Sequence, residues 1–462
     1  MATFFSKNKF PMICRLLIKT FIVLTALIIY KNSIAQTTII TGITLIDGNG
    51  GAPKTDVDLV IQGDRIGSIL IHHNAHFPAG AKVIDMEGKT IMPVMVNAHG
   101  HLGYLKGWAV TSDNYTIENI VRQLKKYESF GIGMVLSLGT DREMIFSLRD
   151  SSRQGKLPGA MFFTAGYGFG APGGPAGSLM EKIFRPGTSE EAIRDVKQLA
   201  LLKPDIIKMW IDDFGGKSPK IKPEIYEAVI KEAHRIGLRV AAHVYYLDDA
   251  RKLVASGVDV LAHSIRDKEI DDGLVKEMKL KGVVYIPTLS LDEYNFIYAT
   301  QPSWMSDPFF QASLEPGVLD TLKTDAYLKK QENDPDRQKK LAAFQTALHN
   351  LQKIFKGGVK VVMGTDSGAQ PVRTQGFSEH LELELMVQAG LSPSEAITCA
   401  TRKGAEFLKV NKQYGTLELG KKADFIILSE NPLNDITHTR SIISVWRNGV
   451  KVSDGPVLRS GQ

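Results

Sequence analysis

Two histidines separated by one glycine, His99 and His101, follow an apolar run rich in Val, Ile and Met at residues 91–97. In a β-strand, alternate side chains point to the same side of the backbone. The two imidazoles would therefore project together from the end of a buried strand, as ligands of a divalent metal ion do. Two packing histidines can share this spacing by chance, so the rest of the chain must decide between the two interpretations.

Four further residues of similar chemistry lie in or at the end of apolar runs. His243 ends the run VAAH, His263 ends VLAH, and Asp366 ends VVMGTD. Lys208 lies inside the apolar run IIKMW, where a lysine is rare unless it is paired or used. Each has an ordinary explanation by itself, such as a core histidine, a lysine paired with a nearby acid or a helix-capping aspartate. Their shared position at strand ends favours a common site.

The runs that carry these residues alternate with helical patterns, which predicts a parallel sheet. The predicted strands cover 91–97, 132–138, 159–165, 205–211, 238–243, 258–263, 282–288 and 359–365. Helical periodicity lies between most of them, at 117–130, 190–202, 223–236, 247–255 and 271–280. Eight such units indicate an α/β fold of the (β/α)8, TIM-like barrel type, in which the chemistry lies at the carboxyl ends of the strands.

Short strand patterns with glycine turns occupy both ends of the chain. We predict that residues 36–90 and 407–462 build one small composite β-sandwich domain, and that residues 91–406 form the barrel. An insertion of 70 residues, 289–358, separates the last two barrel strands. Long insertions in compact domains are often lids or binding elements, so we expect it to cover the pocket and set substrate size. A surface helical pair or a dimer contact is the alternative.

Residues 1–35 have the pattern of a signal peptide. Basic residues precede an 11-residue apolar run at 20–30, and the segment Ser33–Ala35 has the small residues of a cleavage site. The run is short for a bilayer span, an uncleaved anchor being the alternative. We expect export across the inner membrane, most simply to the periplasm, with no stable membrane insertion afterwards. Cleavage would leave Cys399 as the sole cysteine and exclude an internal disulfide.

The formal charge of +6 comes mostly from these first residues, because the rest of the chain holds 51 basic and 50 acidic residues. Nothing in this balance indicates nucleic-acid binding.

Taken together, these motifs resemble the amidohydrolase superfamily, in its branch of imidazolonepropionase-like and prolidase-like enzymes. The segment 97–101 (NAHGH) resembles the family's His-x-His signature, and 364–366 (GTD) its last-strand aspartate. The segments 417–428 and 445–449 resemble its C-terminal sandwich. Lys208 matches the subgroup in which a carboxylated lysine bridges two metal ions.

The resemblance implies a site with two divalent metal ions, expected to be zinc. In that assignment the metal ligands are His99, His101, Lys208, His243, His263 and Asp366. Lys208 would act as a carbamate, since burial lowers the lysine pKa from ~10.4 and exposes the neutral amine that captures carbon dioxide. A hydroxide bridging the metals would attack the carbonyl, and Asp366 would carry the proton to the departing amine.

Three residues are candidates for substrate binding. Tyr245 is expected to donate to the oxyanion, as a tyrosine does at this place in similar enzymes, although a packing role or a role of Tyr246 is equally open. Arg266 could clamp a substrate carboxylate through two hydrogen bonds or pair with a neighbouring acid. His380 matches a histidine common in this branch, and we interpret it first as a packing or supporting residue. The Gly-rich segment 166–178 lacks the ending of a phosphate loop and is expected to be a flexible rim segment.

These features predict a metal-dependent hydrolase of amide C–N bonds in small molecules, acting on dipeptides or N-acyl amino acids. A hydrolase of cyclic amides or imides is the alternative. A non-catalytic exported binding protein is a third reading, which the retained lysine and aspartate disfavour. A homo-oligomer is compatible with the sequence.

Overall fold

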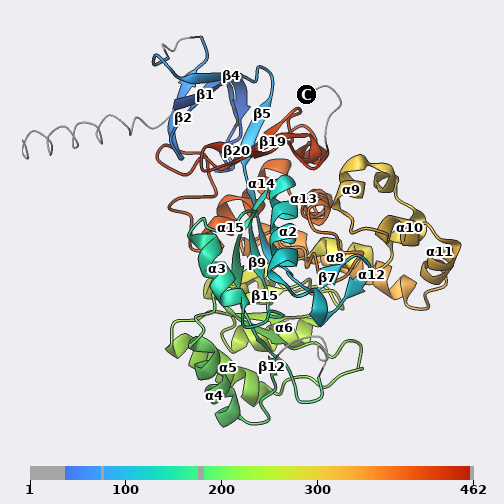
Figure 1. Ribbon diagram of the computed structural model, residues 1–462. Helices are drawn as coiled ribbons and strands as arrows, with labels where there is room; N and C mark the ends of the chain where they lie inside the picture. The colour runs from blue at the N-terminus through green and yellow to red at the C-terminus, as the bar shows by residue number, and fades with distance from the viewer. Residues whose placement is uncertain (1–36, 74–76, 175–181, 458–462) are drawn as a thin grey trace, which may run out of the picture.

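A computed structural model describes residues 37–73, 77–174 and 182–457 (Figure 1). The predicted signal peptide at 1–35 lies outside the described residues, as does the end of the Gly-rich segment at 175–178. Within the described part of the chain, no helix combines the length and apolar character needed to cross a membrane.

One eight-stranded sheet combines the two ends of the described chain, drawn in blue and red in Figure 1. Its main path runs through β20 (Val450–Ser453), β19 (Ile442–Arg447), β18 (Phe425–Leu428), β5 (Thr90–Pro93), β1 (Thr37–Leu45), β2 (Lys54–Gln62) and β3 (Arg65–Ile71), and β4 (Lys82–Asp85) pairs with β1. Strand β5 is parallel to β1 and antiparallel to β18, so it joins the N-terminal strands to the C-terminal ones. The chain therefore needs both ends to complete this domain.

The predicted strand 91–97 is wrong in one respect, because the structure divides it between two sheets. Strand β5 ends at Pro93 in the terminal sheet, and β6 (Met95–Gly100) opens the barrel. At the crossing, the Val94 amide donates to the carbonyl of Asp424 (3.3 Å), and the Met95 amide donates to the carbonyl of Gly131 (2.9 Å). Both strands are buried on both faces, so one unbroken apolar run serves two sheets and hides the boundary.

The barrel has eight parallel strands: β6, β9 (Ile132–Ser137), β10 (Met161–Thr164), β13 (Ile207–Trp210), β14 (Val240–His243), β15 (Val260–Ala262), β16 (Val284–Ile286) and β17 (Lys360–Val361). Ladders join most neighbouring strands. Backbone hydrogen bonds outside the ladders complete the ring. The Ala98 amide donates to the Met363 carbonyl and the Asp205 amide to the Thr164 carbonyl, both at 2.9 Å, and the His101 amide donates to the Ser367 carbonyl at 2.8 Å. The chain thus has the predicted (β/α)8 barrel together with a composite β domain.

Helices cover the outside of the barrel: α2 (Ile117–Ser129), α3 (Ile145–Arg153), α4 (Ser189–Ala200), α5 (Pro223–Arg235), α6 (Leu247–Ala255), α7 (Asp272–Lys281), α13 (Phe377–Gln388), α14 (Pro393–Ala400) and α15 (Arg402–Phe407). The five predicted helices end within two residues of the observed ones. Local signals explain this accuracy: the Thr116 side chain caps α2, the Asp271 side chain caps α7, and Gly282 ends α7 in the left-handed conformation.

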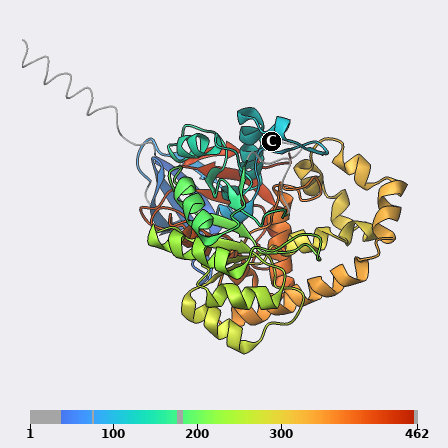
Figure 2. The same ribbon diagram turned by 90° about the horizontal axis from the view of Figure 1, so that it is seen from below.

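The insertion 289–358 is helical and projects from one side of the barrel, drawn in yellow and orange in Figures 1 and 2. Its elements are α8 (Leu289–Tyr294), η2 (Ile297–Thr300), η3 (Ser303–Ser306), α9 (Pro308–Ser313), α10 (Val318–Leu322), α11 (Asp325–Glu332) and α12 (Arg337–Lys356). The buried carboxylate of Glu315 ties it to helix α2, through ion pairs with Arg122 (2.8 Å) and Lys126 (2.6 Å). The Glu315 carboxylate also accepts from the Gly107 amide (3.1 Å), between the short strands β7 (Leu105–Lys106) and β8 (Ala109–Val110).

One buried ion pair supports the terminal sheet where it meets the barrel. The Arg447 Nε lies 2.7 Å from an oxygen of Asp424, and Arg447 also approaches Glu128 of α2 at 3.6 Å. Removing one partner of a buried pair leaves the other charge without compensation.

We expect Arg447→Leu to lower the free energy of unfolding by about 3–5 kcal/mol, measured by chemical denaturation. Lys451→Ala is the control, because its bridge to Asp454 is half exposed and should contribute less than about 1 kcal/mol. Equal effects of both substitutions would contradict this account.

Candidate metal centre

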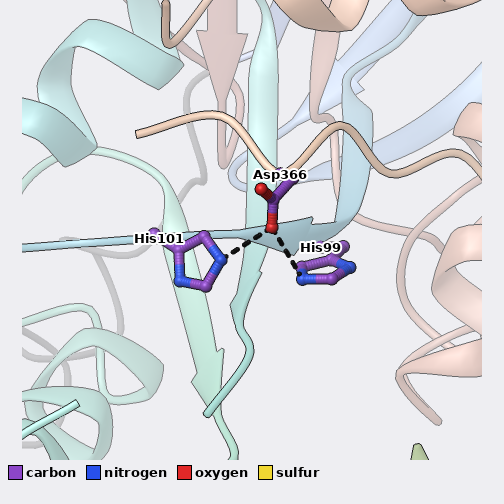
Figure 3. A group of neighbouring side chains, drawn as sticks. All are labelled: His99, His101 and Asp366. Atoms are coloured by element: carbon purple, nitrogen blue, oxygen red, sulfur yellow. Dashed lines mark hydrogen bonds and ion pairs between the residues drawn. The ribbon is translucent and has the colours of Figure 1, made fainter. Parts of the chain in front are cut away.

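Three ligand-type side chains meet at the junction of the first and last barrel strands (Figure 3). The Nε2 atoms of His99 and His101 lie 3.1 Å and 2.8 Å from the same oxygen, Oδ1 of Asp366. One ligand atom from each residue lies within 4.8 Å of the others, and all three side chains are buried. The alternation along β6 thus aims both imidazoles at the loop that follows β17.

A buried polar network holds this group together. The Glu379 carboxylate of α13 accepts from the Asn97 amide (2.7 Å), the Thr365 hydroxyl (2.8 Å) and the Ser367 hydroxyl (2.7 Å). The Asn97 side-chain oxygen in turn accepts from the His99 amide (3.0 Å). Sequence reasoning missed Glu379, because only the folded chain places α13 beside both strands.

The other two predicted histidine ligands continue the cluster. The His263 ring lies between the rings of His99 and His243, with centroid distances of 4.6 Å and 4.1 Å. The Nδ1 atom of His263 is hydrogen-bonded with the Thr288 hydroxyl (2.9 Å), and the Nε2 atom of His243 with Asp212 (3.2 Å). Both rings are thereby fixed in orientation.

Burial keeps these imidazoles neutral. It lowers the pKa of His99 to about 3, that of His243 to about 4 and that of His263 well below its usual value. Burial alone would raise the pKa of Asp366, but the charge and hydrogen bond of His101, with those of His99, hold it well below its usual range. Neutral imidazoles and an ionised carboxylate are the forms that bind metal ions.

Lys208 is almost completely buried beside these residues, with 1% of its surface exposed. Burial lowers its pKa to about 7, although the charge of Asp366 raises it in part. Among the described residues it makes no hydrogen bond or salt bridge. The close approach of Gly139 leaves room for its stem, since a Cβ on Gly139 would lie 2.5 Å from the Lys208 Cγ. The Nζ lies 6.0 Å from the centre of the Trp210 ring. A buried amine without a hydrogen bond or salt bridge is costly, so its presence indicates a use.

The donor set fits a divalent metal ion. Four imidazoles, a carboxylate and a lysine line one cavity, and imidazole with carboxylate is a set that zinc and similar ions accept. The buried Nδ1 of His99 has no hydrogen-bond partner within the described structure, which leaves a nitrogen available for a further interaction.

The cavity that these residues line has a volume of about 460 Å³. Its wall is partly apolar, with Trp210 and Phe214 on one side. Leu291 and Asn295 of the insertion also line it, so the insertion contributes directly to the cavity. Its size suits a small molecule.

The three predicted substrate-binding residues lie in different places. Arg266 lines the cavity, but it is paired: its Nε lies 3.0 Å from Asp292, and its Nη1 donates to the Ser264 carbonyl (2.7 Å). Tyr245 lies under the Arg266 guanidinium, 4.6 Å from it, and is absent from the described cavity lining. The Tyr246 hydroxyl donates to Asp213 (2.8 Å).

His380 lies away from the described cavity lining and is buried in α13. Its two ring nitrogens are hydrogen-bonded with the Thr439 hydroxyl and the Phe130 carbonyl, both at 2.9 Å. These contacts agree with the packing role that the sequence suggested first, and they place His380 away from the cavity rather than in contact with a substrate there.

Arg373 is a cavity residue that the sequence did not reveal. Its Nη1 lies 2.6 Å from Oδ2 of Asp366, the oxygen that does not face the histidines. Its loop, 367–376, has no regular periodicity, so no sequence pattern predicts that the chain turns back on Asp366.

Residues 90–452 match the model of the amidohydrolase family. The chain is a member of the amidohydrolase family. Members generally depend on metal ions and hydrolyse C–N bonds, and this amidohydrolase carries a candidate metal-binding group at the expected strand ends.

Curated relatives include the ochratoxinase of Aspergillus niger, 30% identical over 245 residues, which are 51% of this chain and 42% of that protein. The match thus spans less than half of the ochratoxinase. The 5'-deoxyadenosine deaminase of Methanobrevibacter smithii is 31% identical over 437 residues, 87% of each chain. Among solved structures, a Xaa-Pro dipeptidase with methionine in its active site has a TM-score of 0.71 at 23% identity, covering 90% of this chain and 100% of the other, which shows the shared fold.

The Glu379 network should control metal affinity without touching the metal. Glu379→Gln replaces an acceptor by an amide group that also donates, and it would disturb the bonds to Asn97, Thr365 and Ser367. We expect the metal affinity, measured by chelator competition, to fall about 10- to 100-fold. Glu395→Gln is the matched control, because that carboxylate only caps the exposed start of α14. Unchanged affinity in Glu379→Gln would show that the network does not position the ligands.

Proposed function

We propose that this amidohydrolase is an exported enzyme that hydrolyses the amide bond of dipeptides or N-acyl amino acids. The observation that carries the proposal is that the six predicted ligand residues line one cavity of about 460 Å³ together with two arginines, Arg266 and Arg373. Export is supported by the signal-like residues 1–35.

The predicted ligands divide into two groups around the cavity. His99, His101 and Asp366 would hold one divalent ion, while His243 and His263 would hold a second, with zinc the expected metal. When bound, such ions polarise a carbonyl group and make water more acidic. Burial lowers the pKa of Lys208 to about 7, so a neutral Nζ is present at physiological pH. This nitrogen can add to carbon dioxide and release a proton, and the carbamate so formed would supply oxygen ligands to the metal site.

Asp366 is the residue proposed to move protons. Its low pKa keeps it ionised at neutral pH, so it can accept a proton from the attacking water and pass it to the departing amine nitrogen. The Nη1 of Arg373 lies 2.6 Å from Oδ2 of this carboxylate, and Oδ1 faces the histidines. The chain thereby fixes the carboxylate orientation before substrate binds.

Arg266 is the residue proposed to bind the substrate carboxylate. Asp292 and the Ser264 carbonyl hold its guanidinium in place, and the ring of Tyr245 lies against one face. A guanidinium held in this way loses little side-chain entropy when it binds a carboxylate. The aromatic residues Trp210 and Phe214 would shield the amide from bulk water.

Deamination is a second candidate, because the relative that matches 87% of the chain at 31% identity is a 5'-deoxyadenosine deaminase. A deaminase would use the same histidines and Asp366, but this reaction gives the buried Lys208 no role. Cyclic amides or imides stay a further alternative, and a non-catalytic binding protein would retain the cavity without turnover.

A substrate screen of the metal-loaded protein decides among these candidates. We expect hydrolysis of dipeptides and N-acyl amino acids, and not of hydantoin-like rings or 5'-deoxyadenosine. Asp366→Asn should lower kcat/KM by about 10²- to 10⁴-fold, because it removes the proton carrier, while part of the bound metal remains. Leu419→Ala is the control for the effects of preparing a variant protein, because the Leu419 side chain is exposed and lies in the terminal segment. Turnover of rings or of the nucleoside alone would contradict the proposal.

A further inference from the structure

A second hollow adjoins the catalytic cavity where the insertion meets the β7–β8 hairpin. It has a volume of about 840 Å³ and is lined mainly by α11, by the segment that follows α11 and by Trp108 of the hairpin. Two residues, Asn295 and Gln370, line both this hollow and the catalytic cavity. The two hollows therefore lie side by side, and we name the second one the outer subsite.

Aromatic rings form one wall of the outer subsite. The Trp108 side chain is 44% exposed, and its ring meets that of Tyr327 edge to face at 6.2 Å. Burial raises the pKa of Tyr327 to about 12, so its phenol stays neutral at physiological pH. An exposed tryptophan held against a second ring is a preformed face for another aromatic group.

The remaining wall is positively charged. The outer subsite is lined by Lys329, Lys330 and Lys340, and by one acid, Asp334. Asp334 is paired with Lys340, while Lys329 and Lys330 have no ion pair among the described residues. Two uncompensated cations beside an aromatic face favour an anionic aromatic group.

We propose that the outer subsite binds the distal end of the substrate's acyl group and that this end is an aromatic carboxylate. The inference rests on the proposed function: Arg266 holds the carboxylate of the amino acid, the amide lies among the metal ligands, and the acyl group extends past Asn295 to Trp108. The substrate class is then N-aroyl amino acids with an acidic group on the ring, in preference to small N-acetyl amino acids.

The test compares three substrates with the same amino acid: N-acetyl-, N-benzoyl- and N-(4-carboxybenzoyl)-L-alanine. We expect Trp108→Ala to raise KM about five- to tenfold for the two aromatic substrates and to leave that of the acetyl substrate unchanged. The double substitution of Lys329→Ala with Lys330→Ala should raise KM only for the carboxybenzoyl substrate. Lys323→Ala is the matched control, because this exposed lysine lies outside the outer subsite.

Equal changes for all three substrates, or no change in any variant, would overturn the outer subsite while leaving amide hydrolysis in place. If no substrate is turned over, the proposed function fails, and titration calorimetry with terephthalate still tests the subsite. Binding to the wild type that is weakened in Trp108→Ala and in the double lysine variant would support it. No binding to the wild type would overturn it.

Discussion

The barrel closes where its first and last strands meet, and the buried carboxylate of Glu379 accepts hydrogen bonds from both sides of that junction. The His-x-His pair lies on one side and Asp366 on the other, 265 residues or more away along the chain. Their ligand atoms are close together only if this junction is closed and in register. The candidate metal centre therefore depends on barrel closure, and the Glu379 carboxylate connects the two sides of the junction.

The free-energy cost of burying these ionisable side chains explains why they suit a metal ion. Burial in one cavity lowers the pKa of His99 to about 3, that of His243 to about 4 and that of Lys208 to about 7, so it disfavours the charged form of each group. The buried carboxylate of Asp366 has one cationic partner, Arg373, on Oδ2, while Oδ1 faces the histidines. Bound cations would turn the cost of burying these groups into ligand interactions, so the same features that are unfavourable for folding would favour metal binding.

The outline of this site follows from the sequence for a physical reason. Strand ends share one rim in a barrel, so residues at the ends of apolar runs could be grouped without coordinates. The helices could also be predicted from the sequence, because their capping residues and apolar spacing are local features. The division of residues 90–100 into two strands could not be predicted, because both strands are buried on both faces and have similar apolar sequences. The positions of Arg373 and Glu379 depend on a loop path and on helix placement, which no local pattern encodes.

Diffraction from metal-loaded crystals at neutral pH, with anomalous data at the zinc edge, tests the central claim most directly. The account predicts one ion bound by His99, His101 and Asp366, a second bound by His243 and His263, and density for a carboxylated Lys208 between them. Anomalous peaks elsewhere, or a site with Lys208 unmodified and remote from any ion, would contradict it.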